Sequence, residues 1–209
     1  MIAQCIISKV AEQVAKEKEA NIWGDSEWKD IATLENNNVG IVGEQVIQHL
    51  CVDADIEANI DGSKTKEIGG GVGDGTIKKK SVEIKCARQG TGNAASFQHE
   101  LGEKPWLADY ILFLDISPFN FYLTLFPNMT EEKYKLKGFK CPYFPTRGIT
   151  WRKADVDKDG NKIGGGAFKF DTSVNLNTTQ SKVSNPHTFI WSPTTTIQEI
   201  ADFINRIIN

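Results

Sequence analysis

The chain lacks an apolar run of the roughly 18 to 20 residues that a membrane-spanning helix needs. Its start, Met1 to Val10, has no basic segment followed by an apolar stretch and a small-residue cleavage site, so we expect no secretory signal. The four cysteines form no Cys-x-x-Cys pair and have no histidine at ligand spacing, which argues against a zinc site. These absences predict a cytoplasmic protein with reduced, mostly buried thiols and no membrane partner.

A nucleotide-binding loop is also missing. Residues 69–75 are rich in glycine, but Gly71 to Thr76 breaks the G-x-G-x-x-G spacing and no Gly-Lys-Ser/Thr follows. A strand is expected next, where a phosphate loop requires a helix. We therefore expect no nucleotide cofactor, and we interpret the glycines as a loop that lets the backbone approach a metal ion or DNA.

An overall basic charge is absent, because the net charge is −3. The charges are nevertheless unevenly distributed. Residues 1–75 hold 14 acidic and 6 basic residues, a net charge of −8, whereas residues 133–185 hold 11 basic and 4 acidic residues, a net charge of +7. A chain with this uneven charge can present one positively charged surface to a nucleic acid. The alternative is that these blocks of sequence do not form surface patches in the folded protein.

A length of 209 residues suits one domain with a sizeable core, so we treat residues 1–209 as a single α/β domain. The apolar run Tyr110–Leu114 predicts a central strand that is buried on both faces. Apolar spacing and capping signals predict the other elements: helices at 2–20, 39–51, 97–103 and 130–137, strands at 82–86 and 121–126, a hairpin over 153–170 and a closing helix at 196–208.

The strand at 82–86 carries the most informative pattern in the chain. Successive side chains of a strand point to opposite faces, so Val82 and Ile84 can enter a core while Glu83 and Lys85 point together the other way. Asp74, at the mouth of the glycine turn, can reach the same side. Two carboxylates beside an ammonium group are suited to holding Mg²⁺ and to stabilising the charge of a phosphoryl transition state.

The pattern Asp-x8-Glu-x-Lys, from Asp74 to Lys85, resembles the core motif of the PD-(D/E)XK nuclease superfamily, to which many type II restriction endonucleases belong. The resemblance covers residues 39–126. It implies a restriction-endonuclease-like fold with a central mixed β-sheet flanked by helices. It also implies a Mg²⁺-dependent enzyme that cleaves double-stranded DNA, and two-strand cleavage suggests a homodimer.

The resemblance assigns a role to each residue of the motif. Asp74, Glu83 and the backbone carbonyl of Ile84 would be metal ligands, and Lys85 would orient or help to deprotonate the attacking water. Glu44, from the helix at 39–51, would complete the ligand set or hold a second ion. Two alternatives remain open: Glu44 as an edge glutamate that reaches water, and Asp61, preceded by Ile60, as the first acidic ligand in place of Asp74.

Residues 138–185 are basic and aromatic, and we interpret them as an added β-rich DNA-recognition region. Arginine, lysine and glutamine are side chains that contact phosphates and base edges, and the candidates are Arg88, Gln98, Arg147, Arg152 and Lys153. A solvated β-ribbon is the simpler alternative.

Two further features of the sequence leave room for other interpretations. His99 can be a surface or capping residue or a catalytic one. Asp155, Asp157 and Asp159 imitate an EF-hand loop, but Gly166 replaces its last glutamate, so we expect a hairpin turn.

Three other functions fit parts of the sequence. A repair or junction-resolving nuclease would use the same motif on branched DNA. A non-catalytic DNA-binding protein would use the basic region alone and be insensitive to EDTA. A scaffold protein would bind neither metal nor DNA, so its interactions would not weaken steeply with salt.

Overall fold

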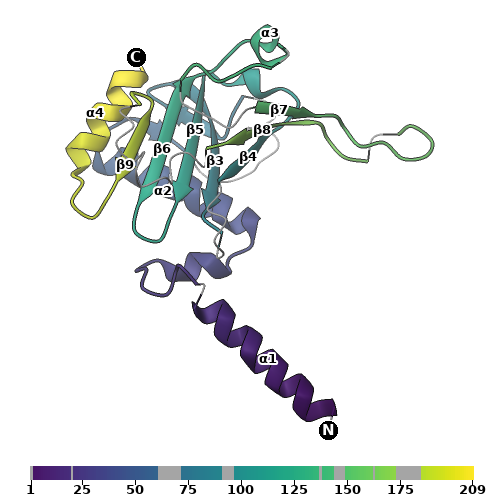
Figure 1. The fold of residues 1–209 in the computed structure, drawn as a ribbon. Coiled ribbons are helices and arrows are strands. Elements are labelled where there is room, and N and C mark those ends of the chain that lie inside the picture. The colour runs from purple at the N-terminus through teal and green to yellow at the C-terminus, as the bar shows by residue number, and fades with distance from the viewer. Residues whose placement is uncertain are drawn as a thin grey trace.

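The computed structural model describes residues 2–19, 21–60, 72–90, 97–136, 138–143, 149–161, 163–172 and 185–209. A six-stranded mixed sheet forms the centre of its α/β fold (Figure 1). The strand order is β1-β2-β3-β5-β6-β9, in which β3 and β5 are parallel and the other neighbours antiparallel. The bounds are β1 (Ala58–Asn59), β2 (Gly75–Ile77), β3 (Lys80–Arg88), β5 (Tyr110–Ile116), β6 (Phe121–Pro127) and β9 (Thr188–Trp191).

Two helices, α2 (Asn36–Asp53) and α4 (Ile197–Ile207), cover one face of this sheet. In α2 the buried residues Val39, Gly43 and Ile47 recur every four positions and form one face of the helix. They pack over Val82 and Ile84 of β3. The helix at 39–51 and the strands at 82–86, 110–114 and 121–126 are thus confirmed. The closing helix is also confirmed, with a capping box between Thr196 and Glu199.

A second, three-stranded sheet covers the other face, in the order β4-β8-β7 (Gln98–Leu101, Ala167–Asp171 and Ile149–Arg152). Its inner side chains, among them Leu101 and Phe170, pack against Phe113 and Phe126 of the large sheet. β7 and β8 pair as an antiparallel hairpin, which confirms the hairpin expected from the sequence. Its turn is held by Asp157, whose Oδ1 accepts from the backbone N–H groups of Asp159 and Asn161.

The predicted helix over residues 97–103 is wrong, because Gln98–Leu101 is strand β4. Phe97 and Leu101 are spaced by four residues, which also fits one face of a helix. The burial instead alternates along the strand, with His99 and Leu101 inside and Gln98 and Glu100 outside. The buried polar His99 is the residue that made the strand pattern unrecognisable in the sequence.

The helix predicted over residues 130–137 is shorter in the structure, where α3 spans only Glu131–Tyr134. The side chain of Asn128 joins this turn to the preceding loop. Its Nδ2 donates to the carbonyl of Ala108 at 2.7 Å, and its Oδ1 accepts from the hydroxyl of Tyr134 at 2.7 Å. The segment around α3 is therefore held in place by side-chain hydrogen bonds as well as by the short helix itself.

The N-terminal helix α1 (Ile2–Glu19) projects away from the two sheets (Figure 1). Its apolar residues Ile6, Val10 and Val14 are exposed, so the amphipathic helix is confirmed but this face does not join the core. The chain after α1 is attached to the body by two tryptophans. Nε1 of Trp23 donates to the carbonyl of Gln89, and Nε1 of Trp28 donates to that of Ser117.

Candidate active site

The candidate site lies at the edge of β3, just beyond the end of its pairing with β2. That pairing runs only from Lys80 to Val82, so the edge of β3 at Ile84 is not covered by a neighbouring strand. The register with β5 places Glu83 beside Ile111 and Lys85 beside Phe113. Both residues consequently face the side of the three-stranded sheet, opposite α2, as the alternation of the sequence predicted.

Asp74 is held at this edge by the turn that precedes it. The backbone N–H of Asp74 donates to the carbonyl of Val82 at 2.8 Å. Gly73 has a φ of 107°, and a Cβ at this position would lie 2.5 Å from the same carbonyl oxygen, so only glycine fits. Oδ2 of Asp74 accepts from the backbone N–H of Ile84 at 2.7 Å. The glycine turn therefore brings a carboxylate to the open edge of the strand.

Three oxygen atoms surround the ammonium group of Lys85. Its Nζ lies 2.5 Å from Oε1 of Glu83, 3.2 Å from the carbonyl oxygen of Ile84 and 3.5 Å from Oδ2 of Asp74. The side chains of Asp74, Glu83 and Lys85 remain 24 to 31% exposed, so solvent or a ligand can reach them. The structure thus brings together Asp74, Glu83, Ile84 and Lys85, as the sequence predicted.

Lys85 remains a cation in this setting. Burial lowers the pKa of its ammonium group and is the largest single influence. The charges of Glu83 and Asp74 and their hydrogen bonds act together in the opposite direction, and the net pKa is raised above its ordinary value. While both carboxylates face it, Lys85 is consequently an ammonium ion at neutral pH.

The oxygen atoms at this edge are of the kind that Mg²⁺ prefers. Mg²⁺ typically binds through one or two carboxylates and keeps several waters. Asp74 and Glu83 supply two carboxylates and Ile84 supplies a carbonyl oxygen, so the donor set fits. Among the residues that the structure describes, no group of three or more histidine, cysteine, aspartate or glutamate side chains is placed to hold a metal ion. A site for zinc is therefore not seen in this part of the chain.

Glu44 is buried on α2, near Cys86 of β3. The neighbouring Gly43 packs directly on Cys86, and a Cβ at residue 43 would lie 2.4 Å from Cβ of Cys86. Burial raises the pKa of the Cys86 thiol, and the charges of Asp115 and Glu44 raise it further. Glu44 is only 5% exposed, which does not fit an edge glutamate that reaches water. Its role as a metal ligand remains a prediction.

The described DNA-binding candidates lie in two places, Arg88 on β3 and the others on or beside the three-stranded sheet. Arg88 donates from its Nη1 to the backbone carbonyls of Ile31 and Leu34 and so ties β3 to the 3₁₀ helix η1 (Lys29–Thr33). Arg152 forms an exposed ion pair with Glu100, 2.5 Å apart. Gln98 is exposed on β4 and Lys153 is exposed after β7. Arg147 and the alternative ligand Asp61 lie outside the described residues.

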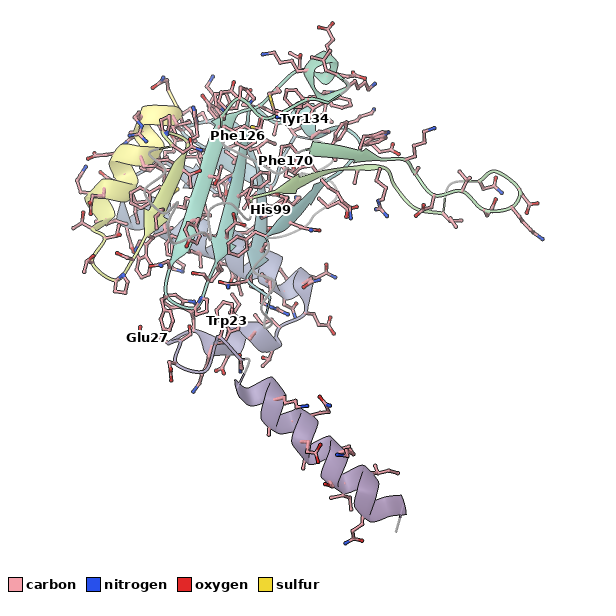
Figure 2. All side chains as sticks on the ribbon, in the orientation of Figure 1. Trp23, Glu27, His99, Phe126, Tyr134 and Phe170 are labelled. Carbon is pink, nitrogen blue, oxygen red and sulfur yellow. The ribbon has the colours of Figure 1, made fainter. Side chains whose placement is uncertain are left out.

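A buried polar pair joins the two sheets behind the candidate site, and it was not predicted. Nε2 of His99 lies 2.6 Å from Oδ1 of Asp115, and the hydroxyl of Thr172 donates to Oδ2 of Asp115 at 2.8 Å. The His99 ring, labelled in Figure 2, stacks on Phe113 with 4.2 Å between centroids. A surface or capping role for His99 is therefore wrong. An aspartate inside a strand buried on both faces was the sequence signal that required such a partner.

Comparisons with known proteins do not place the chain in a family. No protein-family profile matches the chain, and neither curated proteins nor solved structures show a significant match to it. Within the described part of the chain, none of the helices has both the length and the apolar character required to span a bilayer. The function must therefore be inferred from the geometry of the site.

Proposed function

We propose that this protein is a Mg²⁺-dependent endonuclease that hydrolyses double-stranded DNA and is of the restriction-endonuclease-like type. The observation that carries the proposal is the convergence of Asp74, Glu83 and the Ile84 carbonyl on Lys85 at one strand edge. The mixed sheet supports it, because β3 presents Glu83 and Lys85 from the middle of an α/β core. These are the motif residues that the resemblance to PD-(D/E)XK nucleases assigns to catalysis.

Each residue of the site has a definite task in this proposal. Asp74, Glu83 and the Ile84 carbonyl would hold the Mg²⁺ ion, which when bound activates water and offsets phosphate charge. Lys85, whose ammonium group lies beside these oxygen atoms, would orient the attacking water or help to deprotonate it. In the hydrolysis, the water oxygen forms the new bond to phosphorus and the bond to the 3′ oxygen breaks. The attacking water gives up a proton and the leaving 3′ oxygen takes one up, so the products are a 5′-phosphate and a 3′-hydroxyl.

Cutting both strands of a duplex favours a homodimer with two-fold symmetry, acting in the cytoplasm on intracellular DNA. The exposed apolar face of α1, with Ile6, Ile7, Val10 and Val14, offers one surface that a second copy could cover. The dimer, the location and the DNA partner are parts of the proposal.

The test is incubation with unmethylated phage or plasmid DNA in Mg²⁺ and, separately, in EDTA. Wild type should give discrete fragments only with Mg²⁺, and Glu83→Ala and Lys85→Ala should give none. Lys80→Ala is the matched control, since Lys80 is an exposed lysine on the same strand. DNA retarded on a gel but never cut would favour a branched substrate or a binding protein. An absence of retardation as well would contradict the nucleic-acid function.

A further inference from the structure

A cavity of about 760 Å³ lies apart from the candidate active site, between the end of β7, the 3₁₀ helix η2 (Pro105–Leu107) and the segment of α3. Its lining is dominated by aromatic rings, including Trp106, Tyr134, Trp151 and Phe168. The rings contact one another, with centroids 4.6 Å apart for Trp151 and Phe168 and 5.3 Å apart for Tyr134 and Phe168. The volume is in the range of small-molecule sites, and the proposed nuclease mechanism does not use it.

Trp151 forms an open aromatic platform at this cavity. Its indole lies directly on Gly166, where a Cβ would come within 2.4 Å of Cη2, so the side chain is supported by the backbone just before β8. The residue is nevertheless 46% exposed. A large ring that is fixed on one side and solvated on the other can accept a flat ring by stacking.

The charges around the cavity favour an anionic partner attached to that flat ring. Three lysines, Lys104, Lys135 and Lys153, line it, together with the acidic Glu103 and Glu131. Lys135 forms an ion pair with Glu131, so Lys104 and Lys153 are the lysines that the proposal uses. The ammonium group of Lys135 lies 5.5 Å from the ring centre of Trp106. Rings for stacking beside lysines for phosphates are the combination with which proteins bind unpaired nucleotides.

The cavity lies on the same side of the large sheet as the candidate active site. Phe168 belongs to the cluster that packs on Ile111 and Phe113, and Lys85 is the register partner of Phe113. Tyr134 and Phe170 mark this side in Figure 2.

We propose that this cavity binds an unstacked nucleobase of a DNA strand, stacked on Trp151, with the adjoining phosphate held by Lys104 and Lys153. The inference rests on the proposed function, and it specifies how the DNA is bound: one base leaves the double helix and enters the cavity. Such a base costs least to unstack when it is mismatched, damaged or unpaired, so the cavity would select these sites.

The test is fluorescence anisotropy of a fluorescein-labelled single-stranded 8-nucleotide DNA of mixed sequence, titrated with protein in EDTA so that cleavage is excluded. Trp151→Ala should weaken binding by about 10-fold, the effect expected for losing one stacked base, and Trp151→Phe should restore part of it. Lys153→Ala should weaken binding and reduce its salt dependence. Phe119→Ala is the matched control, because Phe119 is an exposed aromatic residue in another turn, and it should stay within 2-fold.

Wild type that fails to bind the strand, or Trp151→Ala that binds within 2-fold of wild type, would overturn the inference. Cleavage by Trp151→Ala and Glu83→Ala, measured in parallel with Mg²⁺, separates the two proposals. Mg²⁺-dependent cleavage without Trp151-dependent binding would refute the nucleobase site alone. Trp151-dependent binding without any cleavage would refute the nuclease alone.

Discussion

The backbone N–H of Ile84 donates to Oδ2 of Asp74 at 2.7 Å, across the gap where β2 has ended and β3 continues. A side chain thereby takes the hydrogen-bonding position that a neighbouring strand would fill. The bond holds the carboxylate beside the carbonyl of Ile84 and the ammonium of Lys85. Residues that are ten apart in the sequence consequently form one cluster of oxygen atoms.

In the proposed mechanism this position favours Asp74 over Asp61 as the first acidic ligand. We predict that Asp74→Ala lowers the rate of Mg²⁺-dependent DNA cleavage by at least about 100-fold, since loss of support around a metal already costs 10- to 100-fold. Asp61→Ala should retain activity, and fragment formation on a gel measures both. An inactive Asp61→Ala beside an active Asp74→Ala would transfer the role to Asp61.

Two glycines of α2 allow a controlled test of how closely this helix packs on β3. Gly43→Ala should lower the free energy of unfolding by about 1 to 3 kcal/mol, because the new methyl group would lie 2.4 Å from Cβ of Cys86. Gly40→Ala, where a Cβ meets nothing within 4 Å, should raise the free energy of unfolding by about 0.5 to 1 kcal/mol. Urea denaturation measures both, and equal effects of the two substitutions would disprove the close contact.

The buried pair of His99 and Asp115 should be essential for stability. His99→Ala leaves a fully buried carboxylate without its imidazole partner, which should cost about 3 to 5 kcal/mol of the free energy of unfolding. His49→Ala, at an exposed position of α2, should stay within about 0.5 kcal/mol in the same urea experiment. A cost below about 1 kcal/mol for His99→Ala would show that the pair does not join the two sheets.

Cys51 should make stability depend on alkaline pH. Burial raises the pKa of its thiol from 9.0 to about 11 in the folded protein. A raised folded-state pKa gives a contribution that is complete below pH 9 and is lost as the pH rises toward about 11. The difference in the free energy of unfolding between wild type and Cys51→Ala should therefore shrink by roughly 2 to 3 kcal/mol between pH 8 and pH 11. A difference that is constant over this range would contradict the burial of the thiol.

Local alternation and apolar spacing were sufficient to predict the elements that carry the site. Val82 and Ile84 alternate with Glu83 and Lys85, so β3 and the directions of its side chains followed from a period of two. Helix α2 followed from its four-residue spacing. Asp74 was expected at the same side because a glycine turn returns the chain onto the strand, and the structure shows the contact.

Long-range pairing was not predictable from the same patterns. Strand β4 pairs with β8, more than 60 residues away. The burial of His99 on β4 makes sense only with its partner Asp115, which lies on β5. Arg88 looks like a DNA-binding residue in the sequence, yet its guanidinium group contacts backbone carbonyls more than 50 residues earlier. Such partners are set by tertiary packing, which local composition does not encode.

The cation site at the edge of β3 is the central claim, and calorimetric titration of Mn²⁺, in place of Mg²⁺, into the protein tests it most directly. Wild type should bind Mn²⁺, and Glu83→Gln should bind it at least about 10-fold more weakly, because one of the two carboxylates is lost. Glu100→Gln, which removes an exposed carboxylate on the other sheet, should bind like wild type. No binding by wild type, or equal binding by wild type and Glu83→Gln, would contradict the account.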